Sequence, residues 1–162
     1  MPFPEPDPPP FHFIVPLTIA NGPSGDTYGV ELAANYAVSE RWRLSGQYTL
    51  LEMHIESSPV AVGHDSDPHN QVYLHSAWDL RDNLEFDVTA RYVDSLEIAN
   101  IPSYITMDLR LAWRPKKHLE LAIVGQNLLQ TYHQEFPQSN VSSPALETEV
   151  PRGVYGTLTW RY

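Results

Sequence analysis

Period-two alternation of apolar and polar residues runs through most of this chain of 162 residues. The clearest run is Trp42, Leu44, Gly46, Tyr48 and Leu50, whose intervening residues are arginine, serine, glutamine and threonine. Successive side chains of a β-strand point to opposite faces, so this run forms a strand with one apolar and one polar face. The chain therefore predicts a sheet whose two faces meet different surroundings.

Eight segments share this alternation, and each is about 9 to 11 residues long, the length that a tilted strand needs to cross a bilayer. Strands of soluble proteins average about 5 or 6 residues. The eight segments are residues 11–19, 28–38, 42–50, 72–80, 84–92, 105–114, 119–126 and 154–162. We predict an all-β fold, an antiparallel up-and-down meander of about eight transmembrane-type strands. This meander makes a partial barrel, either an open curved sheet or a small closed barrel.

The connections between these segments alternate in length. Short polar turns are expected near residues 39–41, 81–83 and 115–118, and long connections at 21–27, 56–69, 94–103 and 129–152. Tight turns on one edge and long loops on the other are typical of outer-membrane barrels. Trp and Tyr residues lie mainly toward the ends of the segments, as expected for rings at the membrane interface.

Composition excludes several other classes of protein. The chain has no stretch of roughly 18 apolar residues, which a transmembrane helix would need, and its mean hydropathy of -0.33 is compatible with a barrel because half of each strand is polar. A net charge of -10 argues against nucleic acid as a partner. The absence of cysteine excludes disulfides and thiolate chemistry.

The first ten residues differ from the rest. Residues 1–10 are dominated by proline and predict an extended tether, while residues 11–162 predict the barrel segment. Residues 1–10 lack the basic and apolar regions of a signal peptide. Because an outer-membrane protein needs an export signal, we expect this chain to be a piece of a longer one.

Several short motifs, in order along the chain, resemble those of the C-terminal barrel of TonB-dependent outer-membrane receptors. They are Tyr28–Leu32, Leu44–Leu51, Asp67–Gln71, Ala90–Val93, Ile101–Tyr104 with Asp108–Leu111, Gly125–Leu129 with His133, Glu135 and Phe136, and finally Arg152 and Trp160–Tyr162. The resemblance implies energised uptake of iron chelates or similar nutrients across the outer membrane of a Gram-negative-type bacterium. The resemblance also implies that the complete receptor is a barrel of about 22 strands closed over an N-terminal plug.

The resemblance also implies partners. They are outer-membrane lipid, the barrel-assembly machinery, the remainder of the barrel and its plug, and the TonB energising protein, which acts through the plug. No plug or energy-coupling motif is present in these 162 residues, so we expect no transport by this segment alone.

The polar positions of the predicted strands are the candidate site. In a barrel they line the lumen and the ligand path, or they form a charge-paired wall that only solvates the lumen. These residues are Glu31, Arg43, His75, Asp79, Glu85, Asp87, Arg91, Asp108, Arg110, Glu120 and Arg161.

No catalytic arrangement, resident metal or cofactor is predicted, so we do not expect an enzyme. Ser142 and Ser143 lack a nucleophile-elbow context, and no glycine-rich phosphate loop is present. His64, Asp65, Asp67 and His69 resemble a metal site in residue type, but loop tips rarely hold the required geometry, and contact with a ferric chelate is the better hypothesis.

The last strand predicts an assembly signal. Its apolar face ends in an aromatic residue, which resembles the signal that the barrel-assembly machinery reads by strand pairing. The residues of this signal are Val154, Leu158, Trp160 and Tyr162.

Three residues predict local backbone features. Gly29 and Gly125 lie inside strands, where glycine usually marks a bend or a close backbone approach. Asn127 is expected to turn the chain out of its strand by bonding its own neighbouring backbone.

Two alternatives remain open at this point. One is a small complete eight-stranded outer-membrane barrel that acts as an anchor or adhesin. The other is a soluble β-sandwich that binds a ligand, in which the Trp and Tyr rings would pack inward as a core.

Overall fold

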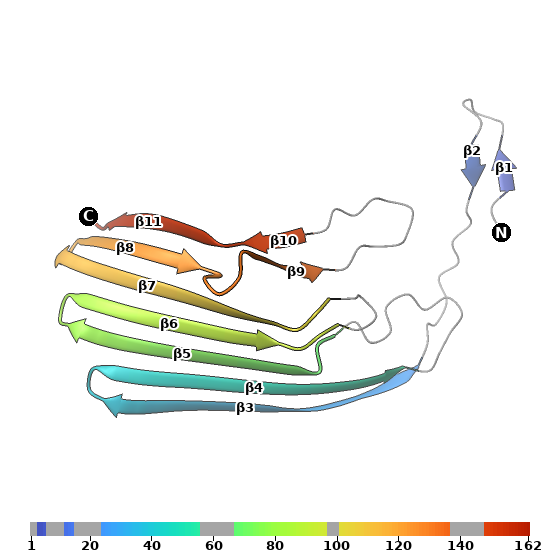
Figure 1. Cartoon of the computed structure of the whole chain (residues 1–162), viewed down its shortest axis with the longest axis horizontal. Coiled ribbons are helices and arrows are strands. Elements are labelled where there is room, and N and C mark those ends of the chain that lie inside the picture. The colour runs from blue at the N-terminus through green and yellow to red at the C-terminus, as the bar shows by residue number, and fades with distance from the viewer. Residues whose placement is uncertain (1–2, 6–11, 15–23, 56–66, 97–100, 137–147) are drawn as a thin grey trace.

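The described part of the chain folds into one large open β-sheet with two short hairpins (Figure 1). The computed structural model describes residues 3–5, 12–14, 24–55, 67–96, 101–136 and 148–162. Seven strands form an antiparallel sheet in the order β11-β8-β7-β6-β5-β4-β3. They are β3 (Gly25–Ser39), β4 (Trp42–Ile55), β5 (Asn70–Arg81), β6 (Leu84–Val93), β7 (Tyr104–Lys116), β8 (Leu119–Gln126) and β11 (Gly153–Trp160). Within these described ranges, no helix is long and apolar enough to cross a membrane.

This sheet confirms the predicted all-β antiparallel meander. Seven of the eight predicted segments correspond to its strands, and sequential strands from β3 to β8 are neighbours. The sheet remains open, with β3 at one edge and β11 at the other, so the predicted partial barrel is observed and the small closed barrel is not.

The N-terminal residues form a separate hairpin. Strand β1 (Phe3–Glu5) pairs antiparallel with β2 (His12–Ile14), and Pro4 lies opposite Phe13. In a two-stranded ribbon one side of each strand has no partner, so a proline on that side removes no ladder hydrogen bond. Residues 6–11 and 15–23 lie outside the described residues. The predicted boundary between tether and barrel therefore remains a prediction, as does most of the predicted strand 11–19.

The three short turns lie where the alternation predicts them, at one edge of the sheet, which we call the turn edge. The strands on either side of each turn are offset by a register shift, between Ala37 and Ser39, Asp79 and Arg81, and Trp113 and Lys116. A carbonyl of each turn accepts a hydrogen bond from a further strand, for example Arg41 O from Asp79 N at 2.8 Å. The strand ends that the predicted long connections join lie at the opposite edge (Figure 1).

The predicted loop 129–152 contains a second hairpin, so that prediction was wrong in part. Strands β9 (Tyr132–Phe136) and β10 (Thr148–Pro151) pair antiparallel and extend the β8–β11 hairpin beyond the main sheet (Figure 1). Five- and four-residue strands with mixed polarity carry too little alternation to stand out from a loop.

Asn127 ends β8, although by other contacts than those predicted. Its φ is 51°, in the left-handed region that asparagine tolerates better than most residues. Its N–H donates to Asp108 Oδ1 at 2.8 Å, and its Nδ2 donates to Val150 O at 2.8 Å. The side chain therefore bonds across to β10, and not to its own neighbouring backbone.

Gly29 confirms the predicted close backbone approach. A Cβ atom at Gly29 would lie 2.3 Å from the carbonyl oxygen of Leu50 on β4, which is backbone and cannot rotate away. At Gly125 the nearest atoms, at 3.0 Å, belong to the Leu128 side chain, which can adjust. The absence of a Cβ is therefore required at Gly29 by the β3–β4 pairing.

We expect Gly29→Ala to destabilise the sheet by about 1–3 kcal/mol, because β3 and β4 must separate locally to accept the methyl group. Gly156→Ala is the matched control, since its nearest atom would be Ala122 O at an ordinary 3.7 Å. Urea unfolding of the chain refolded in detergent micelles, followed by tryptophan fluorescence, measures both. Equal midpoints for the two variants would contradict this role for Gly29.

Candidate functional site: the charged face

The strand register places the predicted lumen residues on one face of the sheet, which we call the charged face. Directly opposed residues of an antiparallel pair share a face. Asp79 lies opposite Glu85, and Asp87 lies opposite Arg110. The opposite face, the apolar face, carries the pairs Trp42–Trp78, Trp78–Phe86 and Phe86–Leu111. The alternation read from the sequence therefore holds across all seven strands.

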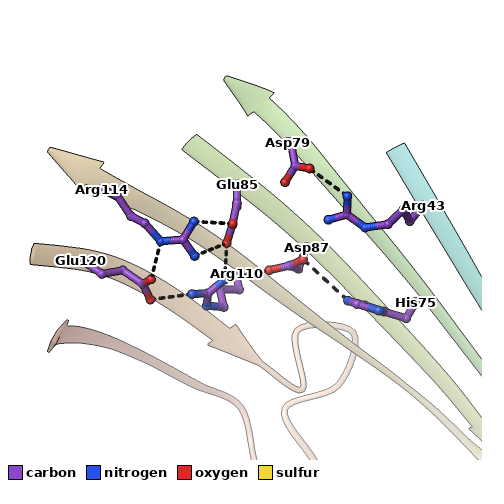
Figure 2. A network of polar contacts seen from close by, with 8 residues as sticks. All are labelled: Arg43, His75, Asp79, Glu85, Asp87, Arg110, Arg114 and Glu120. Atoms are coloured by element: carbon purple, nitrogen blue, oxygen red, sulfur yellow. Dashed lines mark hydrogen bonds and ion pairs between the residues drawn. The ribbon is translucent and has the colours of Figure 1, made fainter. Parts of the chain in front are cut away.

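Arg114 contacts carboxylates of both strands that flank β7 on the charged face (Figure 2). Its guanidinium group donates to both oxygens of Glu85 on β6, with Nη2 at 2.8 Å from Oε2, and its Nε lies 2.9 Å from Glu120 Oε2 on β8. Two-pronged arginine–carboxylate contacts are among the stronger hydrogen bonds in proteins. One side chain of β7 thus ties together both neighbouring strands.

Arg110, on the same face of β7, repeats this arrangement. It contacts Asp87 at 2.9 Å, Glu120 at 2.7 Å and Glu85 at 3.5 Å. Two guanidinium groups and three carboxylates therefore form one connected network over β6, β7 and β8.

Two further contacts lie on the same face: one links β5 to this network, and the other, between β4 and β5, stands beside it. Asp87 Oδ1 lies 3.7 Å from His75 Nε2, and Asp79 Oδ2 lies 2.9 Å from Arg43 Nη1. Figure 2 shows these side chains in a row across neighbouring strands. We call this set the charge ladder; it consists of Arg43, His75, Asp79, Glu85, Asp87, Arg110, Arg114 and Glu120.

Side chains of the apolar face are more exposed than the carboxylates of the charged face. Water-soluble proteins show the reverse. The Glu120 side chain on β8 is 15% exposed, whereas Ile123 on the apolar face of the same strand and Leu74 on that of β5 are 62% and 55% exposed. Large exposed apolar areas mark surfaces that meet another protein or a membrane. Few residues are buried in the hydrophobic core, among them Val93, Ala112 and Ala122, because the main sheet is a single layer.

The structure brings together seven of the eleven predicted lumen residues. Arg43, His75, Asp79, Glu85, Asp87, Arg110 and Glu120 belong to the charge ladder. Asp108 accepts the N–H of Asn127 instead. Glu31, Arg91 and Arg161 form no ion pair with any residue that the structure describes.

Arg114 is not among the predicted lumen residues. Its position four residues after Arg110 places it on the same face of β7, so the alternation itself contained the signal. Pro115 indicated a turn there, but β7 continues to Lys116.

The proposed loop cluster is only partly described. His64 and Asp65 lie outside the described residues, while His69 Nδ1 lies 3.2 Å from Glu52 Oε1. Within the described ranges, no three His, Asp or Glu side chains are arranged to hold a metal ion. The function of this loop remains a prediction.

Aromatic residues border the apolar face at both edges. All four tryptophans of the chain, Trp42, Trp78, Trp113 and Trp160, lie near the turn edge. Trp42 stacks on Trp78 with ring centroids 6.0 Å apart. Such rings suit the boundary between hydrocarbon and water.

At the opposite edge, tyrosine and asparagine surround Asp94, which follows β6. Asn70 Nδ2 donates to Asp94 at 3.0 Å, Ser95 N at 2.9 Å and Tyr92 Oη at 3.2 Å, while Tyr48 Oη donates to Asn70. These donors, the Asn70 amide first, lower the pKa of Asp94 below its ordinary value.

The predicted assembly-signal residues lie in and just after β11, the last strand of the sheet and one of its two open edges. Val154, Leu158 and Trp160 project on the apolar face of β11, and Tyr162 follows that strand. Strand β11 pairs with β8 on one side only, so its other side is a free edge. The role of these residues in assembly remains a prediction.

Comparison with known proteins agrees with this architecture. A family model described as "TonB dependent receptor-like, beta-barrel" matches residues 3–128. Among solved structures, the ferric-catecholate import receptor Fiu from K12 E. coli, in its closed form, is similar with a TM-score of 0.65 and 18% sequence identity. The match covers 85% of this chain and 21% of the Fiu chain, so this chain spans about a fifth of that receptor. At this identity the likeness shows the fold alone.

Proposed function

Since this chain belongs to the TonB-dependent receptor β-barrel family, we propose that it is the C-terminal barrel segment of a receptor for energised nutrient uptake. The proposed location is the outer membrane of a Gram-negative-type bacterium, and the proposed cargo is an iron chelate or a similar nutrient. The segment alone does not transport; it supplies part of the wall that surrounds the plug through which the TonB protein acts.

The observation that carries this proposal is the inversion of the two faces. Apolar side chains such as Leu32, Tyr36 and Val154 are exposed, while the charge ladder is partly shielded on the opposite face. A lipid environment accepts the first face, and a wet lumen accepts the second. No second sheet packs on the apolar face within the described ranges, which disfavours the soluble β-sandwich.

The strand directions support a partnership with further barrel strands. Six antiparallel steps lead from β3 to β11, so these two edge strands run in the same direction, both toward the turn edge (Figure 1). An antiparallel barrel cannot close by joining two strands of the same direction. The remainder of the barrel must therefore supply an odd number of strands, which also argues against a complete barrel made of these seven.

Single-cysteine labelling tests the membrane orientation, because the chain has no cysteine of its own. A fluorophore is placed in turn at residues 44–49 of β4 in the chain refolded into lipid vesicles. We expect brominated lipid to quench the label at Leu44, Gly46 and Tyr48, and aqueous iodide to quench it at Ser45, Gln47 and Thr49. Quenching without this alternation would overturn the proposal.

The uptake role is tested separately in cells. Disrupting the coding segment of this chain in its host should abolish TonB-dependent uptake of a radiolabelled iron chelate, and restoring the complete gene should recover it. If uptake of iron chelates is unchanged by the disruption while the quenching experiment shows that the strands face lipid, the chain is a barrel segment and the proposed cargo is wrong.

Deleting Tyr162 in the complete receptor should reduce the amount of barrel assembled in the outer membrane, because the aromatic end of β11 is part of the proposed assembly signal. Tyr162→Phe is the matched control and should assemble normally. Heat-modifiable mobility of surface-labelled receptor on gels measures folded barrel. Normal assembly of the deletion variant would contradict this role.

A further inference from the structure

A cavity of about 370 Å³ lies at the edge opposite the turns, between the start of β7 and the β9–β10 hairpin. Its volume is near the lower end of the range for small-molecule sites, about 300–1,000 Å³. No residue of the charge ladder lines it. It is therefore a separate feature of the chain.

Aromatic rings form one wall of this cavity. Tyr104 and His133 stack with centroids 4.4 Å apart and planes inclined by 28°. His133 is buried, and its Nε2 lies 3.0 Å from Glu135 Oε1, which holds the ring in place. Tyr132 also lines the cavity and remains more than half exposed, so its ring is free to meet a ligand.

The backbone around the cavity is held on both sides. Leu128 N donates to Met107 O at 2.9 Å and Arg152 N donates to Thr131 O at 2.9 Å. Together with the two hydrogen bonds of Asn127, these contacts hold the β9–β10 hairpin in place beside β7. A wall held in place before binding loses less conformational entropy when a ligand arrives.

The polar groups of the lining select against anions. They include the amides of Gln130 and Gln134 and the carboxylate of Glu149, and no lysine or arginine is among the lining residues that the structure describes. An anionic ligand would meet the like charge of Glu149 inside the cavity. Amides both donate and accept hydrogen bonds, which suits a ligand bearing several hydroxyl groups.

We propose that this cavity binds a sugar ring of an uncharged carbohydrate. The C–H face of the ring packs on the exposed Tyr132 ring, and its hydroxyl groups bond to Gln130, Gln134 and Glu149. The inference rests on the proposed function and narrows it: the ligand that reaches this receptor carries a neutral sugar at the point where it meets this wall.

Isothermal titration calorimetry of the chain in detergent micelles tests this inference with three neutral disaccharides, maltose, cellobiose and lactose, and with ferric tris-catecholate as an anionic probe. We expect at least one disaccharide to bind, with affinity about tenfold lower in Tyr132→Ala and in Gln134→Ala, a loss of about 1.4 kcal/mol. Lys117→Gln, in a turn at the other edge, is the control and should bind as the unmodified chain does.

The outcomes separate this inference from the proposed function. Absence of binding by all three disaccharides, affinity in both variants equal to that of the unmodified chain, or displacement of the sugar by ferric tris-catecholate would overturn the carbohydrate site. If Tyr132→Ala does not fold, Gln134→Ala decides. Sugar binding without lipid quenching of β4 would overturn the membrane role and leave the cavity standing, and the reverse result would overturn only the cavity.

Discussion

Replacing Leu32 by arginine should prevent stable insertion of the sheet into lipid, whereas the same change at the next residue, Ala33, should be tolerated. Leu32 lies near the middle of β3 on the apolar face and is 60% exposed, while Ala33 is exposed on the charged face. An arginine facing lipid at the bilayer midplane costs about 2–4 kcal/mol, and one facing a wet lumen costs much less.

Equilibrium urea titration of the two variants in phosphatidylcholine vesicles measures this difference. Both positions are in the middle of the same strand, and each lies directly opposite a residue of β4. A larger loss at Ala33 than at Leu32 would reverse the assignment of the two faces, and equal losses would remove the argument for a lipid-facing side.

Replacing Arg114 by methionine should destabilise the charged face by about 1–3 kcal/mol, the cost of leaving polar groups without their partners. Glu85 loses both of its bonds to this guanidinium group, and Glu120, the most shielded carboxylate of the charge ladder, loses one. Arg110 still contacts both carboxylates, which limits the loss.

Arg43→Met is the matched control for this change. Its pair with Asp79 is more exposed and involves one carboxylate, so its loss should be smaller than that of Arg114→Met. Adding Glu85→Gln to Arg114→Met should recover part of the stability, because the second change removes a charge whose remaining contact is the 3.5 Å one with Arg110. Urea unfolding in detergent micelles measures the stability of all three variants. An Arg114→Met effect no larger than that of Arg43→Met would contradict the role of Arg114 in holding β6 and β8 to β7.

The strands of the main sheet could be predicted because the alternation that produces them is a local pattern in the sequence. Trp42–Leu50 alternates so regularly that the strand and its two faces follow from period two alone, and the polar turn at 39–41 follows from the same pattern, although β4 continues to Ile55 beyond the predicted end. The β9–β10 hairpin was missed because its strands are short, and its placement depends on contacts of Asn127 with β7 and β10. Those partners are 19 and 23 residues away in the chain, beyond any local pattern.

In the candidate site, too, part of the arrangement follows from the local sequence and part from contacts between strands. Alternation placed Glu85, Arg110 and Glu120 on one face, but which carboxylate meets which guanidinium group depends on the register between strands. The shift between Trp113 and Lys116 belongs to that register, and Arg114 adjoins it. Register is determined by hydrogen bonding across strands and by turn geometry. The partners of Arg114, Glu85 and Glu120, therefore became visible only in the folded sheet.

The amino-acid sequence by itself determined the strands, their two faces and the edge at which the short turns lie, because side-chain alternation and turn chemistry act between near neighbours in the chain. Tertiary structure decided the open edges of the sheet, the pairing within the charge ladder and the cavity beside the β9–β10 hairpin. Each of these depends on distances between residues of different strands, and such distances arise only when the backbone ladder brings the strands together.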